Sequence, residues 1–400
     1  MKFGKAQIHD LPIRDITTLG AYADQLQLEY QTRNEPFPPA ARLHIGEPDF
    51  RTPEHIRQAA IESLATEMQT YGAAAGRPWL RELLAEKIAR VNGYRIQPTH
   101  TAIGMGGTGV IQATLLATVG PGDEVLLPDP CWPHYTLQLA ACGATGVPYP
   151  LDPQNEWLPD LERMEQLITP RTRLLIINSP GNPTGTVFPQ SMIQQLLEFA
   201  SRHDLYLLSD ECYDQMIFEG QHLSPASLLS TAEFEEGRVI SAYTFSKTYA
   251  MTGWRLGYVA ASTQMIKTIT DVLNAGLTNV STAIQRAGAA ALTGPQECVA
   301  MMREAYRRRR DLAVSLLRDF DRYVYTPHGA FYVLIDIRQR NGEPRDGREF
   351  ALELVRQCNI TVTPGYSFGA AANDYVRVSL AADDKAVERG VREICRLANL

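Results

Sequence analysis

Five short apolar runs, with amphipathic stretches between several of them, constrain the fold more than any other feature of this sequence. The runs are EVLLPDP (124–130), RLLIINSP (173–180), LYLLSDE (205–211), RVISAY (238–243) and RLGYVAA (255–261). Each is typical of a strand buried on both faces, whereas GVIQATLLATV and SMIQQLLEFASRHD have the apolar spacing of helices. Buried strands that alternate with helices predict an α/β fold with a mostly parallel, helix-wrapped sheet.

The two ends of the chain differ from this pattern. Residues 1–40 contain the proline-rich patch NEPFPPAA and predict an irregular arm or linker. Towards the other end, a long charged helix (about 295–319) precedes the runs GAFYVLIDI and YVRVSLA, which predict a smaller α+β domain. We therefore expect an N-terminal arm and small-domain segment at 1–46, a large domain at 47–293 and a C-terminal small domain at 294–400.

Composition excludes several classes of partner. A net charge of -7 disfavours nucleic acid or an anionic membrane surface as the main partner. The run RRRR at 307–310 covers every side of a helix, so these arginines are expected to be solvated or paired. No apolar run is long enough to cross a membrane, and the six cysteines lack metal-ligand spacing. The sequence predicts a soluble, cytoplasmic protein with reduced thiols and no metal site.

Unusual side chains follow several of the predicted strands, where ligands bind in open α/β sheets. Asp210 ends an apolar run, and a buried carboxylate is costly unless a cation meets it. Asn182 lies in a turn before Pro183, so it is not a simple helix cap. The stretch GMGGTGVIQATLLA (104–117) places glycines where a helix begins, which favours a phosphate only weakly. Trp132, taken alone, is as well explained as a core aromatic residue.

Lys247 lies in SAYTFSKTYAMTGWRLGY (241–258), among hydroxyl, small and aromatic residues typical of a buried segment. Only six of the 38 basic residues are lysine, so the chain uses arginine wherever a plain positive charge suffices. An ammonium group can lose its proton and become a nucleophile, whereas a guanidinium stays charged. A solvated lysine at a strand end is the alternative when this residue is considered alone.

Together, these residues provide what pyridoxal phosphate requires: a phosphate cradle, a buried carboxylate, a stacking tryptophan, polar partners and an activatable lysine. The sequence resembles the class I/II aminotransferases of the aspartate aminotransferase fold type. The resemblance extends from LHIGEPDFRTPEHI to the C-terminus, and GEPDF, NSPGNPTG, SDECYD, SKTYAMTGWRLGY and VRVSLA occur in the family's order and spacing.

The resemblance implies roles around the ring of the cofactor. Lys247 would form the Schiff base and carry the proton between the substrate Cα and the cofactor C4′. Asp210 would pair with the pyridine nitrogen, and Trp132 would stack on the ring. Asn182 and Tyr213 would hydrogen-bond the ring oxygen and favour its deprotonated form.

The resemblance also implies anion sites. Those that would hold the cofactor phosphate are Gly107, Thr108, Gly109, Thr244, Ser246 and Arg255. Thr244 departs from the serine or glycine usual in the family, but it keeps a hydroxyl group. Arg377 would bind the substrate carboxylate beside Gly46 and Asn182.

Two further implications concern assembly and specificity. Tyr71 matches a tyrosine that family members donate to the neighbouring subunit's phosphate, which implies a homodimer with shared active sites. Specificity would lie in the N-terminal arm (Ile16–Thr18), at Thr108 and in a loop from the partner subunit (Thr278–Asn279), and none of these residues is arginine or lysine. This weakly disfavours a dedicated dicarboxylate pocket.

The function that the resemblance implies is transfer of an amino group from an L-amino acid to a 2-oxo acid by a pyridoxal-phosphate-dependent aminotransferase. A lyase or cyclase with the same fold and cofactor site is an alternative. A second alternative is a non-catalytic regulator that uses this fold as a ligand sensor. The regulator is disfavoured because the sequence has no basic N-terminal extension for a DNA-binding domain.

Overall fold

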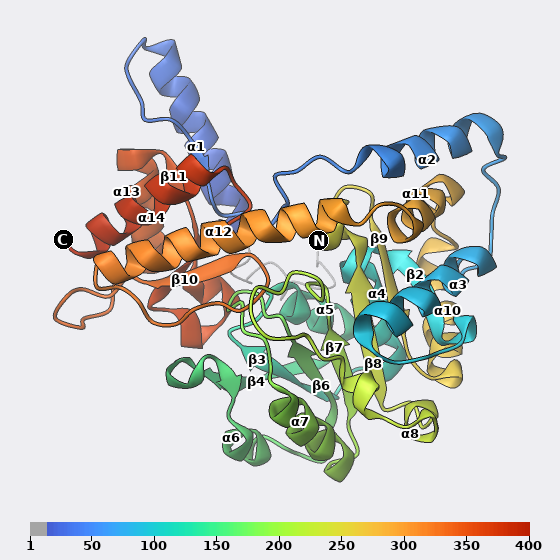
Figure 1. The fold of residues 1–400 in the computed structure, drawn as a ribbon. Coiled ribbons are helices and arrows are strands. Elements are labelled where there is room, and N and C mark those ends of the chain that lie inside the picture. Colours follow the sequence, from blue (N-terminus) through green and yellow to red (C-terminus); the bar gives the residue numbers. More distant parts are fainter. Residues whose placement is uncertain (1–13) are drawn as a thin grey trace, which may run out of the picture.

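A computed structural model of the chain describes residues 14–400, with side chains from residue 17 (Figure 1). Its largest sheet has eight strands. In chain order these are β2 (Thr101–Met105), β3 (Glu124–Asp129), β4 (Thr145–Asp152), β5 (Leu158–Pro159), β6 (Thr172–Asn178), β7 (Tyr206–Asp210), β8 (Val239–Thr244) and β9 (Leu256–Ala260). Their spatial order is β2-β9-β8-β7-β6-β3-β4-β5. Within it, β9 and β5 run antiparallel to their neighbours, so the sheet is mostly parallel, as predicted.

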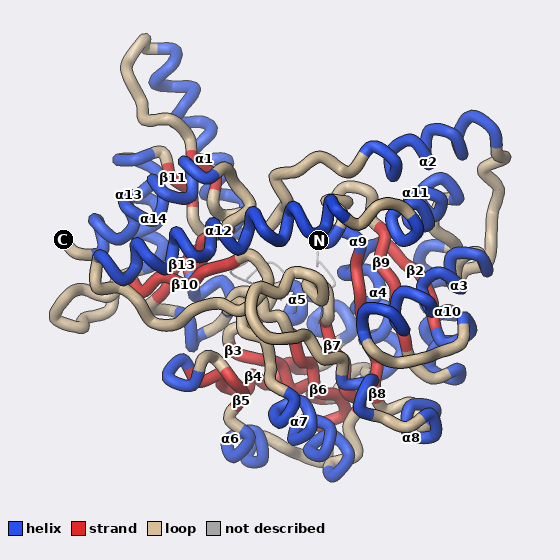
Figure 2. Tube along the Cα trace, viewed as in Figure 1, coloured by secondary structure: helices blue, strands red, loops and turns tan. Residues whose placement is uncertain are grey.

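The sheet is covered on both faces by helices (Figure 2). Alternate residues of β6 enter two different apolar clusters: Leu174 and Ile176 join one, and Leu175 and Ile177 join the other. All four side chains are fully buried, which confirms the prediction of strands buried on both faces. The helices of this part of the chain are α2 (Glu54–Thr66), α3 (Pro78–Lys87), α4 (Gly106–Thr118), α5 (His134–Cys142), α6 (Leu161–Gln166), α7 (Gln190–Arg202), α8 (Thr231–Glu235), α9 (Phe245–Thr248), α10 (Thr263–Leu277) and α11 (Thr282–Thr293).

A second, smaller part is formed by the C-terminal residues and one N-terminal segment. Its antiparallel sheet has the order β10-β13-β12, and a separate parallel pair joins β1 to β11. These strands are β1 (Ala41–Arg42), β10 (Tyr332–Asp336), β11 (Ile360–Thr361), β12 (Thr363–Pro364) and β13 (Tyr375–Ser379). The β1–β11 pairing brings the N-terminal segment to the C-terminal part, and the boundaries at residues 46 and 293 stay a prediction.

The long helix α12 (Glu297–Asp319) runs between the small sheet and α11 in Figure 1. It packs against α14 (Asp384–Ala398), which in turn contacts α13 (Gly347–Cys358). The arginine run at 307–310 lies on α12, and each of its four members forms an ion pair. Arg309 and Arg310 are nevertheless buried. The expectation of solvated or paired arginines is therefore confirmed as pairing. None of the helices in residues 14–400 is long and apolar enough to cross a membrane.

The prediction of an irregular arm over residues 1–40 is wrong for much of that range. Residues Arg14–Thr32 form the 19-residue helix α1. The proline-rich patch begins only after this helix, and its first proline is Pro36, so its helix-breaking character does not extend back over residues 14–32. The preceding residues, 1–13, lie outside the described part of the chain.

Candidate active site

A cavity of about 280 Å³ lies where the large sheet meets the small part of the molecule. It collects all the catalytic, cofactor-binding and substrate-carboxylate residues expected from the sequence except Gly109 and Tyr71. The expected residues that line it are Gly46, Gly107, Thr108, Trp132, Asn182, Asp210, Tyr213, Thr244, Ser246, Lys247, Arg255 and Arg377. Gly109 lies one residue farther along the first turn of α4.

Lys247 belongs to the short helix α9, which follows β8 directly. Thr244 caps this helix by accepting a hydrogen bond from the backbone N–H of Ser246 at 3.1 Å. The Lys247 Nζ donates to the backbone carbonyl of Gly46 at 2.7 Å. A Cβ on Gly46 would lie 1.9 Å from the Tyr332 hydroxyl, so this close approach requires glycine. Burial lowers the pKa of Lys247 to about 8, which makes its neutral amine accessible near neutral pH.

Asp210 ends β7, and its side chain is buried. The Tyr135 hydroxyl donates to one of its oxygens at 2.5 Å, and the backbone N–H of Cys212 donates to the other at 3.1 Å. Burial raises the pKa of Asp210, and within residues 17–400 no cationic side chain forms an ion pair with it. A buried carboxylate with this environment would be stabilised by a cationic ligand.

Arg377, on the central strand of the small sheet, is a buried cation that also lacks a carboxylate partner in the described chain. Its Nη1 donates to Asn182 Oδ1 at 3.0 Å, and its Nη2 donates to the His44 carbonyl at 2.6 Å. The buried Nε has no hydrogen-bond partner. The guanidinium lies over the rings of Tyr332 and Phe368, at 4.4 and 4.6 Å from their centroids. This group is suited to bind the carboxylate of a small ligand.

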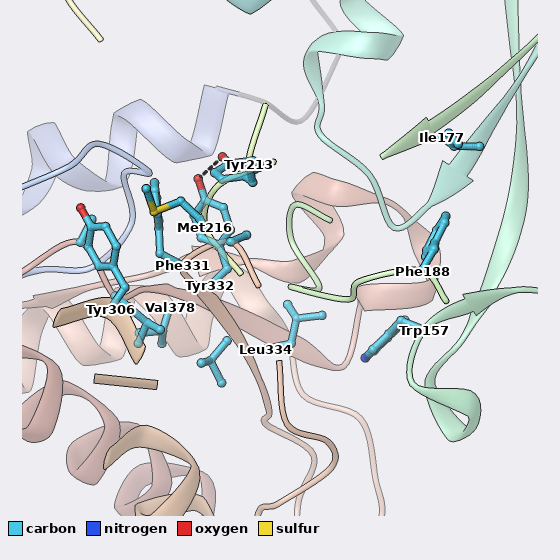
Figure 3. Close-up of a cluster of buried hydrophobic side chains, with 14 of the residues drawn as sticks. Trp157, Ile177, Phe188, Tyr213, Met216, Tyr306, Phe331, Tyr332, Leu334 and Val378 are labelled. Atoms are coloured by element: carbon cyan, nitrogen blue, oxygen red, sulfur yellow. Dashed lines mark hydrogen bonds between the residues drawn. The ribbon is translucent and has the colours of Figure 1, made fainter. Parts of the chain in front are cut away.

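Tyr213 meets Tyr332 at the same wall of the cavity. Their hydroxyl oxygens are 2.8 Å apart, and Figure 3 shows the two rings within an apolar cluster that includes Phe331 and Met216. Both tyrosine rings are buried, so packing restricts their orientation while their hydroxyl groups form a polar pair.

The N-terminal end of α4 lines one side of the cavity through Gly107 and Thr108. Free backbone N–H groups and the helix dipole favour negative charge there. Arg255 lies beside it, with Nη2 3.5 Å from the Met105 carbonyl and φ +55°, a left-handed conformation unusual for arginine. A Cβ on Gly257 would lie 2.4 Å from the Gly106 carbonyl carbon, so glycine is needed to bring β9 this close to α4. Thr244 and Ser246 add hydroxyl groups 2.9 Å apart.

Trp132 lines the cavity and is partly buried. Its indole ring stacks on His134 with centroids 4.4 Å apart and meets Tyr135 edge-on at 5.4 Å. It also packs against the apolar cluster on one face of the sheet. The residue therefore combines a core contact with access to the cavity.

The residues expected to act across a subunit boundary, and those expected to set specificity from the N-terminal arm, do not line this cavity. Tyr71 is 86% exposed in the loop before α3. The Asn279 side chain accepts a hydrogen bond from the backbone N–H of Gly72 at 3.2 Å, which places the 278–279 segment beside Tyr71. Thr17 and Thr18 lie on α1 and do not line the cavity, and the Ile16 side chain lies outside the described residues.

Several side chains of the site were not identified from the sequence. Tyr135, Tyr332 and Phe368 all contact a residue that was identified. The run GAFYVLIDI indicated a strand but not that Tyr332 would reach the cavity. No local pattern distinguishes these aromatic residues from ordinary core residues, because their partners are distant in the chain.

Comparisons with known proteins agree with this geometry. A family model described as aminotransferase class I and II matches residues 39–394. The probable aspartate/prephenate aminotransferase of Thermus aquaticus is 39% identical over 355 residues, which cover 87% of this chain and 89% of that protein. The arginine–pyruvate transaminase of Pseudomonas aeruginosa is 34% identical over 357 residues, which cover 89% of each.

A solved structure of the Thermus thermophilus aspartate aminotransferase with maleate has a TM-score of 0.87 to this fold and 35% sequence identity. The match covers 99% of this chain and 100% of that chain. The family model, the sequence relatives and the solved structure agree over nearly the whole length. The chain therefore belongs to the class I and II aminotransferase family and is an enzyme that transfers amino groups.

Proposed function

We propose that this chain binds pyridoxal phosphate in the cavity beside Lys247 and uses it to move an amino group from an L-amino acid to a 2-oxo acid. The observation that carries the proposal is a set of three groups around one cavity. Lys247 has a lowered pKa, Asp210 is a buried carboxylate with no cation, and Arg377 is a buried cation with no anion. A zwitterionic substrate and a cationic ring would supply the missing charges.

The cavity residues fit the cofactor group by group. Asp210 would accept a hydrogen bond from the protonated ring nitrogen, and Trp132 would cover one face of the ring. The Tyr213 hydroxyl and the Asn182 amide would donate to the ring oxygen. The phosphate would be bound by the N-terminal turn of α4 (Gly107, Thr108 and Gly109) and by Thr244, Ser246 and Arg255, which supply donors without an acidic residue among them.

When bound, the cofactor supplies an aldehyde that captures amines and a ring that withdraws electrons. The protein contributes positioning and proton transfer. Lys247 would link to the cofactor and, when the substrate displaces it, would move a proton at the substrate Cα; its pKa of about 8 suits both tasks. Arg377 would hold the substrate carboxylate with Gly46 and Asn182 beside it, which fixes the Cα near the Lys247 amine.

Transamination is favoured over elimination or cyclisation because the relatives are named as aminotransferases or transaminases. A panel of amino acids, assayed with and without a 2-oxo acid, tests this directly. We expect sustained turnover only when the 2-oxo acid is present, and one turnover per site without it. Sustained turnover with the amino acid alone would contradict the proposal.

The substrate class follows in part from charge. Three lysine or arginine side chains, Lys247, Arg255 and Arg377, lie among the described residues that line the cavity, and the first two are assigned to the cofactor. Arg377 is left to bind a substrate carboxylate, and Thr108, an expected specificity position, is not cationic. We therefore propose a monocarboxylic amino acid as the preferred donor. The relatives' names do not decide the question, since they include both aspartate/prephenate and arginine.

We also propose that two chains form each active site. Tyr71 and the 278–279 segment, both expected at a partner's site, lie together through the Gly72–Asn279 hydrogen bond and away from the cavity of their own chain. The 86% exposure of Tyr71 in one chain supports a role at a subunit interface. Its hydroxyl would bind the phosphate of the partner's cofactor.

Mixed dimers test the shared site. A Tyr71→Phe chain paired with a Lys247→Ala chain should form one site with both native residues, and that site should bind pyridoxal phosphate with wild-type affinity. If Tyr71 acts within its own chain, the affinity would equal that of the Tyr71→Phe homodimer. As the matched control, a wild-type chain paired with the double variant should have no intact site.

The lysine assignment has its own test. Reduction of the yellow holoenzyme with borohydride, followed by peptide mapping, should find the cofactor on Lys247. A label on any of the other five lysines would contradict it. The six free thiols support the further proposal that the enzyme works in a reducing compartment such as the cytoplasm.

A further inference from the structure

A buried lysine that does not line the cavity packs against chain segments that carry site residues. Lys87, like Lys247 one of only six lysines, has a side chain that is 4% exposed. Its Nζ forms an ion pair with Asp214, whose side chain is equally buried, and donates to Asn92 Oδ1 at 2.8 Å. Asn92 in turn donates to Asp214 at 3.0 Å. Each member of this positioning cluster (Lys87, Asn92 and Asp214) therefore contacts the other two.

The local backbone explains how the cluster forms. Lys87 ends α3, and residues Ile88–Asn92 continue as one turn of π-helix before Gly93 ends it with φ +81°. In a π-turn, residues five apart face the same side, so Lys87 and Asn92 converge on one partner. Short π-turns of this kind are frequent at functional sites.

The cluster contacts both strand ends that carry the proposed chemistry. Asp214 directly follows Tyr213 after β7, and its backbone N–H donates to the Glu211 carbonyl at 3.1 Å. The Lys87 Nζ also lies 4.7 Å from the ring centroid of Tyr243, the residue before Thr244 at the end of β8. One cation thus contacts the segment that presents Tyr213 and the strand that leads to Lys247.

Several other side chains surround Tyr213 and Asp214. Tyr332, Cys212 and Arg377 face the Tyr213 hydroxyl, and Tyr249 and Tyr258 lie close to Asp214. Within the described residues, Lys87 is the only lysine or arginine in an ion pair with Asp214. Without it, a carboxylate would remain buried beside Tyr213.

We propose that the positioning cluster fixes Tyr213 and the end of β8 beneath the cofactor, and thereby controls how readily the ring oxygen of the cofactor loses its proton. The proposal rests on the proposed function, since it requires pyridoxal phosphate on Lys247. Lys87 touches neither substrate nor cofactor in this arrangement. It acts through Tyr213, whose hydrogen bond to the ring oxygen favours the deprotonated form.

The test is a pH titration of the visible absorbance of the holoenzyme. Lys87→Met should raise the apparent pKa of this absorbance change by about 0.5–1 pH unit. The reason is that a weaker hydrogen bond from Tyr213 favours the deprotonated ring oxygen less. Asn92→Ala, which leaves the ion pair in place, should shift it in the same direction by less. If Lys87→Met does not fold, the Asn92→Ala titration decides alone.

Two controls separate positioning from general loosening. Arg322 is a buried cation in the small part that donates to Asn399 and to the Ala398 carbonyl. Arg322→Met should lower the thermal midpoint without moving the absorbance titration. Lys267→Met, at an exposed lysine on α10, should change neither the thermal midpoint nor the absorbance titration. Wild-type titration curves in the folded cluster variants, or an equal shift in Arg322→Met, would overturn the inference. If the wild-type protein shows no lysine-bound absorbance, the proposed function fails instead.

Discussion

Lys87 is buried and Lys247 is partly buried, and the surroundings of these two rare lysines differ. Lys87 has a carboxylate and an amide as partners, whereas Lys247 has one backbone carbonyl and faces a cavity. The same contrast separates Asp214, which is paired, from Asp210, which has no cation. Buried charge with a protein partner stabilises a particular backbone arrangement; buried charge without one is available to a ligand.

The largest expected effect is at Lys247. Lys247→Ala should lower kcat/KM for transamination by at least about 10³-fold, because general acid–base and nucleophilic roles are both lost. Thermal unfolding of the cofactor-free variant should resemble wild type, because no protein carboxylate loses its partner. Near-normal turnover would show that Lys247 is not the reactive lysine, and the proposed difference from Lys87 would be wrong.

Asp210→Ala should have the next largest effect. An opposite charge about 4 Å away contributes roughly 4 kcal/mol at an effective dielectric of 20, or about 3 pK units at the ring nitrogen. We expect the variant to keep bound cofactor through Lys247 and the phosphate donors, while its single-turnover rate falls by about 10²–10³-fold. A normal rate with bound cofactor would show that the carboxylate is not needed to keep the ring protonated.

Lys87→Met should lower the free energy of unfolding, which a substitution at Lys247 should leave close to the wild-type value. Removing one partner of a buried ion pair costs about 3–5 kcal/mol of unfolding free energy, because the other charge stays buried. Lys247→Met, the matched change at the unpaired lysine, should cost little or should stabilise the cofactor-free protein. Chemical denaturation of both variants measures the difference. Equal losses would show that pairing does not distinguish the two sites.

The smallest effect is the pH dependence of Lys247 itself. Its pKa of about 8 lies below the ordinary value of 10.5, so in the cofactor-free protein about half of this amine should be neutral at pH 8. Because the unfolded chain holds the proton up to pH 10.5, stability should rise as the pH increases from about 8 to 10.5. Acetylation rates of the cofactor-free protein, followed by mass spectrometry as a function of pH, should give an apparent pKa near 8 at Lys247.

The sequence predicted the strand ends well because each lies within one short stretch. Buried runs such as LYLLSDE show both the strand and the polar residue that follows it. Tyr135 and Asp214 were different: the first meets Asp210 across 75 positions, and the second meets Lys87 across 127. Contacts between residues so far apart in the sequence leave no local pattern, so the positioning cluster became apparent only in the folded chain.

The helix α1 was missed for a different reason. Its amphipathic pattern is weak, and the prolines that follow it suggested that the whole N-terminal region was irregular. The family resemblance identified the cavity residues but did not align this region. Local composition is therefore a poor guide where a helix depends on contacts with distant elements, here α13 and β11.

The position of Arg377 on the middle strand of the β10-β13-β12 sheet has a consequence for synthesis. As the chain leaves the ribosome, Lys247 and Asp210 emerge long before β13 does. The small sheet cannot close until residue 379 is available, because β13 separates the other two strands. A nascent chain, or one truncated before β13, thus presents its reactive amine without a clamp for the substrate carboxylate, and selective capture of amino acids begins only after residue 379 has been synthesised.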